Sequence, residues 1–315
     1  MSSHVGSAAS SQVGAKAEEQ HKQKTMDLPG VFPMPIILSP LLQHIHTFII
    51  LHGRGSTAEQ FSTPLLETTT ASGESLRTAF PHAKLIFLTA SRNRATIYKK
   101  SYTHQWFDHW HMDGQNKRQD LIAPGLYKSC NYVHGILQQE IESVGKENVV
   151  LWGLSQGCAT SLTSTLTWNG EPFAATIGMC GYLPYVNHLT HIIKKDDSES
   201  DFDPFCSSDT DDDVAVSGDK GPQDRQTQAV QYLRDEIEME GPAQMVFRDT
   251  AIFLGHGTED EKVSIEIGRE ARVCLDLMGA DVTMVEYEGL GHWYSSEMLG
   301  DIFRFLRENL RIQNS

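Results

Sequence analysis

Short apolar runs alternate along the chain with longer stretches in which apolar residues recur every three or four positions. The short runs are rich in β-branched residues and are bounded by Gly, Pro or polar residues, as buried strands are. They predict strands at residues 47–51, 83–88, 148–152, 173–179, 251–254 and 282–287.

The stretches between these strands have helical spacing of their apolar positions. They predict helices at residues 65–80, 124–145, 159–168, 263–278 and 302–310, the first of them broken or kinked near Gly73. Strands that alternate with helices form a mostly parallel sheet with helices on both faces. In such a sheet, active sites gather beyond the carboxyl ends of the strands.

Two stretches do not follow this alternation. Residues 1–27 are polar and predict a disordered N-terminal tail, with structure beginning near Phe32. Residues 194–240 hold 15 acidic and 5 basic residues and predict a disordered acidic insertion, with a short helix near residues 229–240. The insertion therefore supplies most of the formal net charge of −15, and its acidity argues against nucleic acid as its partner.

The cysteines are odd in number, widely spaced and without a CxxC pair, which is typical of reduced thiols in a cytosolic protein. The N-terminal residues lack the apolar core of a signal peptide, and no run of about 18 apolar residues occurs. We therefore expect a cytoplasmic protein without integral membrane association. The sequence indicates no oligomeric state.

The most informative stretch is residues 148–158, NVVLWGLSQGC. It contains the pattern GxSxG, which is typical of a strand, a tight turn and a helix, with the serine hydroxyl exposed at the turn. A β-carbon at Gly153 or Gly157 would collide with the backbone of so tight a turn. Ser155 is therefore the candidate nucleophile.

A serine hydroxyl needs an imidazole to take its proton and a carboxylate to orient that imidazole. Asp260 lies in the loop directly after the strand at residues 251–254, and His292 lies in the loop after the strand at residues 282–287. The chain order Ser155, Asp260, His292 is that of the α/β-hydrolase fold, which we predict for residues 28–315. Glu259 and Asp249 are alternatives for the acid. Asp249 precedes its strand, whereas only geometry can exclude Glu259.

An acyl-transfer site also needs two backbone N–H groups that stabilise the oxyanion. Gln156 follows the nucleophile and would supply one of them. Arg54 lies in the HGRG loop after the first strand and would supply the other, because Gly53 and Gly55 let the backbone come close. His52 is expected to hold that loop through side-chain hydrogen bonds.

Several segments resemble a known family in order and spacing. They are FIILHGRGSTAEQF, QWFD, LWGLSQGCATSL, YLP, LGHGTEDEKV and YEGLGHWY. The chain resembles the phospholipase/carboxylesterase family, which includes acyl-protein thioesterases, over residues 47–310 without the insertion. The resemblance implies Ser155, Asp260 and His292 as the catalytic triad. It also implies Arg54 and Gln156 as oxyanion donors and a substrate groove beside residues 106–108.

Two positions depart from the family pattern. The loop usually reads HGLGD and here reads HGRGS, which places the cation of Arg54 beside the oxyanion hole. Its guanidinium is a candidate for selecting substrates with an anionic group near the scissile bond. The usual SQGG is SQGC here, and Cys158 is expected to be a buried packing group rather than a second nucleophile.

A histidine cluster raises the question of a metal. His104, His109 and His111 lie near Asp108 and Asp113, but they lack the HxxxH spacing of a helical metal site. The segment also matches the wall of the family's groove. We therefore predict no metal site.

Aromatic residues crowd the two loops that flank the predicted site, and they predict an apolar acyl or alkyl pocket. Trp106, Phe107 and Trp293 are the candidate substrate-binding residues, and Trp110 and Tyr294 belong to the same two loops.

Together these features predict a serine hydrolase that cleaves carboxylic esters or thioesters through an acyl-enzyme, without a cofactor. Two alternatives remain open. One is a lysophospholipase with the same triad, and the other is a ligand-binding protein of the hydrolase fold with little turnover.

Overall fold

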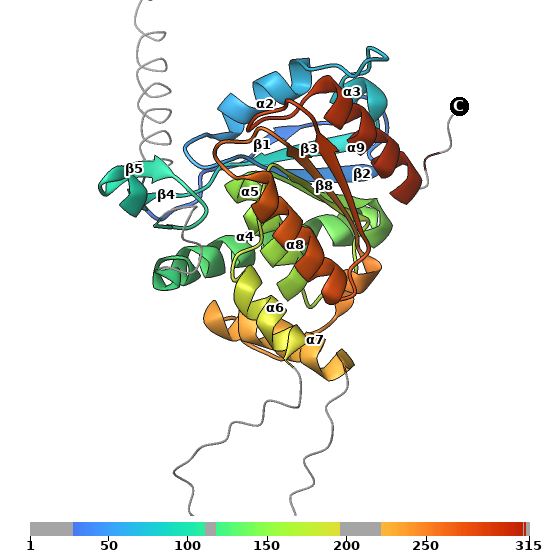
Figure 1. The fold of residues 1–315 in the computed structure, drawn as a ribbon. Helices are drawn as coiled ribbons and strands as arrows, with labels where there is room; N and C mark the ends of the chain where they lie inside the picture. The colour runs from blue at the N-terminus through green and yellow to red at the C-terminus, as the bar shows by residue number, and fades with distance from the viewer. Residues whose placement is uncertain (1–27, 111–117, 196–221, 311, 313–315) are drawn as a thin grey trace, which may run out of the picture.

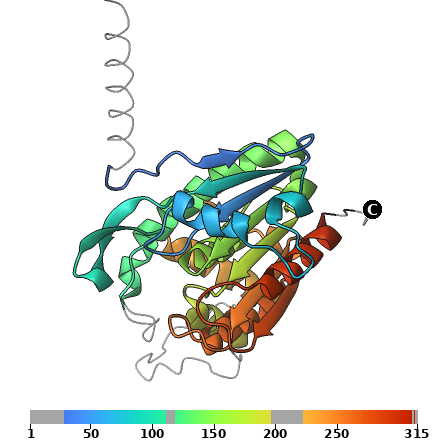
Figure 2. The same cartoon turned by 90° about the horizontal axis from the view of Figure 1, so that it is seen from above.

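The computed structural model describes residues 28–110, 118–195, 222–310 and 312. The predicted tail at residues 1–27 and residues 196–221 of the predicted insertion lie outside this part of the chain. The described residues form a central sheet with helices on both of its faces, as predicted (Figure 1, Figure 2).

The central sheet has seven strands in the order β1-β3-β2-β6-β7-β8-β9. Only β1 is antiparallel to its neighbour, so the prediction of a mostly parallel sheet is confirmed. The strands are β1 (Ile36–Leu38), β2 (His46–Leu51), β3 (Ala83–Leu88), β6 (Val149–Leu154), β7 (Ala175–Met179), β8 (Ala251–Gly257) and β9 (Val282–Tyr287).

Helices cover the two faces unequally (Figure 1). One apolar core joins the sheet to α2 (Ala58–Glu67), α3 (Leu76–Ala79) and α9 (Ser296–Asn309). The larger core lies on the other face, against α4 (Ala123–Val144), α5 (Gln156–Thr167), α6 (Val186–Lys194), α7 (Pro222–Glu236) and α8 (Ile265–Leu277). Short 3₁₀ turns occur at Thr96–Tyr98, Gln119–Leu121, Lys146–Asn148 and Val246–Asp249.

Helix starts differ most from the prediction. The break predicted near Gly73 is confirmed: the helix predicted at residues 65–80 is two helices, separated by a turn in which Gly73 has a φ of +81°. The first begins at Ala58 because the Thr57 side chain accepts the Gln60 N–H and caps it. Similarly, α9 begins at Ser296, well before the predicted residue 302, because Ser295 caps the Met298 N–H. Capping side chains, rather than the apolar stripe, set both starts.

The apolar pattern predicted no strand or helix between residues 88 and 124, but part of this connection is regular. β4 (Arg92–Ala95) and β5 (Ser101–His104) pair as an antiparallel two-stranded ribbon. The arginines of β4 lie over the Tyr102 ring of β5, with the Arg94 guanidinium 4.8 Å from the ring centroid. Such a ribbon has no apolar face of its own, so the apolar pattern did not reveal it.

The prediction of a disordered insertion is wrong for residues 222–236, and the short helix expected near residues 229–240 is the second half of a longer helix. These residues contain α7, which packs beside α6 over the larger core (Figure 1). Ala229, Leu233 and Ile237 are fully buried there, and Arg234 donates to the Thr167 carbonyl at 2.6 Å. The segment is acidic on average, but these apolar residues fall at helical spacing and form one buried stripe. Within the described ranges, no helix combines the length and apolar character of a membrane span.

Candidate active site

The GxSxG stretch forms the predicted elbow between β6 and α5. Ser155 sits at the turn with a φ of +57° and a ψ of −117°, a conformation that costs free energy for a residue with a side chain. A β-carbon on Gly153 would lie 2.3 Å from the backbone of Gly157, and one on Gly157 would lie 2.5 Å from the Leu51 carbonyl oxygen. The predicted steric need for both glycines is confirmed.

Three side chains from separate strand ends meet at this elbow. His292 Nε2 lies 2.9 Å from Ser155 Oγ, and His292 Nδ1 lies 2.7 Å from Asp260 Oδ2. An ionised carboxylate can only accept, so Nδ1 carries the hydrogen and Nε2 accepts the serine O–H. The three residues that the sequence singled out are therefore connected in a single hydrogen-bonded relay.

Asp260 is buried and is held by more than His292. Its Oδ1 accepts the backbone N–H groups of Lys262 and Val263, each at 2.9 Å. Burial acts to raise the pKa of Asp260, but hydrogen bonds from His256, His292 and the Val263 N–H outweigh it and hold the pKa well below its usual range. The carboxylate is thus ionised and oriented before any substrate arrives.

The geometry also separates Asp260 from the two alternative acids. Glu259 is exposed, and its backbone N–H bonds to the Leu290 carbonyl. Asp249 ends a 3₁₀ turn before β8, at the opposite end of the strand. Neither carboxylate is the one bonded to His292.

His256 is a second histidine beside the acid, and the sequence reasoning missed it. It is buried, and its Nε2 lies 2.8 Å from the Val263 carbonyl oxygen and 3.3 Å from Asp260 Oδ2. It therefore ties the two sides of the loop after β8 together. Its position in GHGTED, at the carboxyl end of a strand, was the signal that could have found it.

The HGRG loop lies directly against the nucleophile. A β-carbon on Gly53 would lie 3.3 Å from Ser155 Cβ. The predicted structural role of His52 is confirmed, because its Nε2 accepts the Ala90 N–H at 3.0 Å and its Nδ1 donates to the Gly53 carbonyl at 2.7 Å. Burial lowers the pKa of His52 to about 4, which keeps the ring neutral.

Gln156 begins α5, so its backbone N–H is among the first N–H groups of the helix, which have no partner within the helix. Its buried side chain has a structural task. Oε1 accepts the Trp106 N–H at 3.0 Å, and Nε2 donates to the Phe107 carbonyl at 2.7 Å. These bonds join the elbow to the loop at residues 105–110, which we call the Trp-rich loop.

Trp106 and Phe107 were predicted to line the substrate pocket, but neither does. Each is only 1% exposed and belongs to the larger core. The Trp106 ring donates to the His52 carbonyl at 2.8 Å, and α4 approaches Phe107 so closely that a β-carbon on Gly125 would lie 2.6 Å from its Cα. Both side chains therefore support the site from within the core.

A pocket of about 190 Å³ opens over Ser155 and His292. Trp293 lines it as predicted, and its side chain is 42% exposed. The other aromatic residues of its lining were not predicted and come from separate parts of the chain: Phe61, Tyr98 and Tyr182.

The histidines near the Trp-rich loop serve other partners. His104 Nδ1 bonds to the Ala90 carbonyl, His109 Nδ1 bonds to Arg54, and Asp108 accepts from Thr96. His111 and Asp113 lie outside the described residues. The described residues of this cluster are therefore bonded to different partners.

The cysteines near the site are buried thiols. Cys180 Sγ lies with the carboxylate and imidazole of the relay in a group whose possible ligand atoms are within 4.8 Å of one another. Burial raises the pKa of Cys180 to about 12, and the thiol donates to the Trp293 carbonyl, so this group fits a metal poorly. Cys158 packs against Gly178 and Gly181, as a packing group would.

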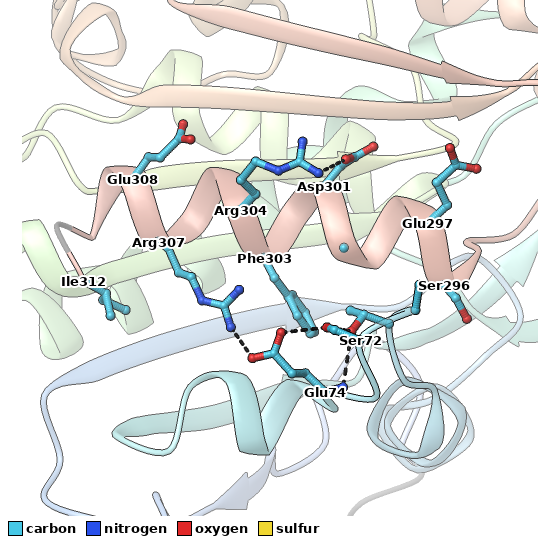
Figure 3. Close-up of a pocket in the computed structure, with 13 residues that line it drawn as sticks. Ser72, Glu74, Ser296, Glu297, Asp301, Phe303, Arg304, Arg307, Glu308 and Ile312 are labelled. Atoms are coloured by element: carbon cyan, nitrogen blue, oxygen red, sulfur yellow. Dashed lines mark hydrogen bonds and ion pairs between the residues drawn. The ribbon is translucent and has the colours of Figure 1, made fainter. Parts of the chain in front are cut away.

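A larger hollow of about 540 Å³ lies elsewhere, between α9 and the turn after α2 (Figure 3). Four of its charged side chains form two ion pairs, Arg307 with Glu74 and Arg304 with Asp301. It does not include the Ser155 relay.

Known proteins share the architecture. The crystal structure of Zea mays acyl-protein thioesterase 2 matches with a TM-score of 0.58 at 20% identity, over 88% of this chain and 98% of that one. A Bacillus cereus carboxylesterase matches with a TM-score of 0.53 at 12% identity, over 93% of this chain and 99% of that one. These likenesses show the fold.

Sequence comparison leads to a family. Acyl-protein thioesterase 1 of Neurospora crassa is 24% identical over 280 residues, which make up 88% of this chain and 91% of that protein. The sequence profile of the phospholipase/carboxylesterase family matches residues 33–200 and 232–310. The residues between these two ranges belong to the acidic segment at residues 194–240. With most of its length matched and a Ser-His-Asp relay at its strand ends, the chain belongs to the phospholipase/carboxylesterase family.

Proposed function

We propose that the chain is a serine hydrolase that cleaves carboxylic esters or thioesters through an acyl-enzyme on Ser155. The observation that carries the proposal is the relay from Ser155 Oγ through His292 to the buried Asp260, with bonds of 2.9 and 2.7 Å. Relatives named as acyl-protein thioesterases and carboxylesterases support this reaction class.

The geometry suits both halves of the reaction. His292 Nε2 takes the Ser155 proton as Oγ attacks the carbonyl carbon, and Asp260 stabilises the imidazolium that forms. The oxyanion accepts hydrogen bonds from the backbone N–H groups of Arg54 and Gln156. His292 then protonates the leaving alkoxide or thiolate. Water, deprotonated by the same imidazole, attacks the acyl-enzyme and releases the acid.

The strained elbow contributes to this chemistry. Its φ of +57° holds Ser155 Oγ clear of its own strand, at hydrogen-bond distance from His292. The arrangement needs only the chain's own side chains and water, and we propose no cofactor or metal for it.

Substitution of the nucleophile tests the proposal. Ser155→Ala is expected to abolish turnover of 4-nitrophenyl butyrate and covalent labelling by a fluorophosphonate probe, because both require the serine oxygen. Ser296→Ala, at an exposed serine at the start of α9, is the matched control and is expected to retain both. Labelling of Ser155→Ala at the wild-type level would rule out Ser155 as the nucleophile.

A further inference from the structure

Two cations line the pocket over Ser155. They are Arg54, from the loop after β2, and Lys262, from the loop after β8. Among the described residues, the lining contains no Asp or Glu side chain. Since the chain as a whole has a net charge of −15, this local excess of positive charge runs against the general composition.

The Arg54 guanidinium is held in place by neutral groups. Its Nη1 lies 3.0 Å from His109 Nδ1, and its Cζ lies 5.5 Å from the centroid of the Tyr98 ring. His109 in turn stacks on Tyr182, with the ring centroids 6.1 Å apart. An arginine can only donate, so His109 Nδ1 accepts and the Arg54 charge is not neutralised by this contact.

Lys262 approaches the same pocket from the other side. In the sheet order, β6 with its Ser155 elbow lies between β2 and β8, so the loops of Arg54 and Lys262 flank the nucleophile. The Lys262 side chain is exposed, while its backbone N–H is fixed by Asp260 Oδ1. The ion pairs among the described residues include neither Lys262 nor Arg54.

We propose that Arg54 and Lys262 form an anion-binding subsite that directs this pocket to esters and thioesters carrying a carboxylate near the scissile carbonyl. The inference rests on the proposed hydrolase function and defines its substrate class. A carboxylate matches the planar fork of a guanidinium with two parallel hydrogen bonds. Because neutral groups already hold Arg54, little side-chain entropy is lost when the anion binds.

The pocket size is consistent with a compact substrate. Its volume of about 190 Å³ is below the range of about 300–1,000 Å³ that is typical for drug-sized ligands. The aromatic walls would contact the carbon skeleton of such a substrate, and the two cations would bind its charged end.

Two pairs of esters test the subsite and locate the anion. For the acyl side, mono-4-nitrophenyl adipate is compared with methyl 4-nitrophenyl adipate, which lacks the charge. For the leaving-group side, 4-acetoxybenzoate is compared with 4-acetoxybenzamide. The measured quantity is the ratio of kcat/KM for the charged ester to kcat/KM for its neutral counterpart.

The wild-type enzyme is expected to prefer the charged ester in at least one pair. Arg54→Leu, which keeps the backbone N–H, is expected to lower the ratio about tenfold, since a hydrogen bond to a charged group contributes that much. Lys262→Met is expected to lower it about threefold, because an exposed pair contributes less. Lys128→Met removes the same charge from an exposed position on α4 and is expected to leave the ratio unchanged.

Failure of the subsite and failure of the proposed function give different results. If wild type cleaves charged and neutral esters alike and Arg54→Leu leaves both ratios unchanged, the subsite is overturned while the hydrolase stands. If no ester is turned over, calorimetry can still measure how mono-4-nitrophenyl adipate and 4-acetoxybenzoate bind to Ser155→Ala. The subsite predicts that binding of at least one of them weakens about tenfold in Ser155→Ala/Arg54→Leu, and equal affinities for both esters would refute it.

Discussion

Two hollows of the molecule, the groove beside α9 and the pocket over Ser155, differ in size and in how their charged groups are arranged. The groove beside α9 is the larger, at about 540 Å³, and four of its charged residues form two separate ion pairs (Figure 3). The pocket over Ser155 has about 190 Å³, yet its hydrogen bonds run in series from a hydroxyl to a buried carboxylate. Volume alone would select the wrong site.

Burial explains the difference. A carboxylate at the surface is solvated and is stabilised little by its partner. Asp260 is withdrawn from water, so its charge persists only because several N–H groups are directed at it. A buried carboxylate whose pKa is shifted by specific hydrogen-bond partners is typical of a functional site.

The largest expected effect is on activity, and it compares the carboxylate of Asp260 with that of Glu74 in the groove. Asp260→Asn is expected to lower kcat on 4-nitrophenyl butyrate about 10³- to 10⁴-fold, because an amide no longer fixes the imidazole tautomer. Glu74→Gln, in the groove, is expected to leave kcat unchanged. Steady-state kinetics measure both, with circular dichroism to verify the fold. A Glu74→Gln loss as large as that of Asp260→Asn would remove the distinction between the hollows.

The second effect is on the free energy of unfolding, and it compares Gly157 in the elbow with Gly300 beside the groove. Gly157→Ala is expected to destabilise the fold by about 3 kcal/mol, because the new β-carbon meets backbone at 2.5 Å that cannot move aside. Gly300→Ala, on the α9 side of the groove, is expected to stabilise by about 0.5–1 kcal/mol, since its β-carbon meets nothing within 4 Å. Urea unfolding measures both, and a stable Gly157→Ala protein would contradict the tight elbow.

The third effect is the pH dependence of stability. The pKa of Asp260 is lower in the folded chain than in the unfolded one, so ionisation of Asp260 stabilises the fold. Relative to Asp260→Asn, this stabilisation is complete above the unfolded pKa of about 3.9 and decreases as the pH falls toward the folded pKa. It amounts to about 1.4 kcal/mol for each unit of lowering. Urea unfolding between about pH 3 and 7 tests this, and a difference that grew on acidification would contradict it.

The sequence predicted the strand ends and the relay because both follow from local patterns. The apolar runs at residues 83–88 and 282–287 coincide with β3 and β9. Ser155, Asp260 and His292 could be found because parallel strands bring their carboxyl ends to one edge of the sheet. Composition misled at α7, where an acidic average concealed a buried stripe.

Long-range packing could not be predicted in the same way. Aromatic residues suit both a pocket wall and a core, and only the contact with α4 and the Gln156 side chain shows that Trp106 and Phe107 are core. The sequence also placed a cation at Arg54 but could not show that His109 orients it. In each case the contacting residue is distant along the chain, Gln156 from Trp106 and His109 from Arg54.

The central claim is that the acyl group passes through Ser155. Wild-type enzyme quenched in acid during turnover of 4-nitrophenyl butyrate, and then mapped by peptide mass spectrometry, tests it directly. The relay predicts one butyryl group, on the peptide that contains Ser155, and none in Ser155→Ala. Butyryl on a different residue, or steady turnover by Ser155→Ala without any adduct, would contradict it.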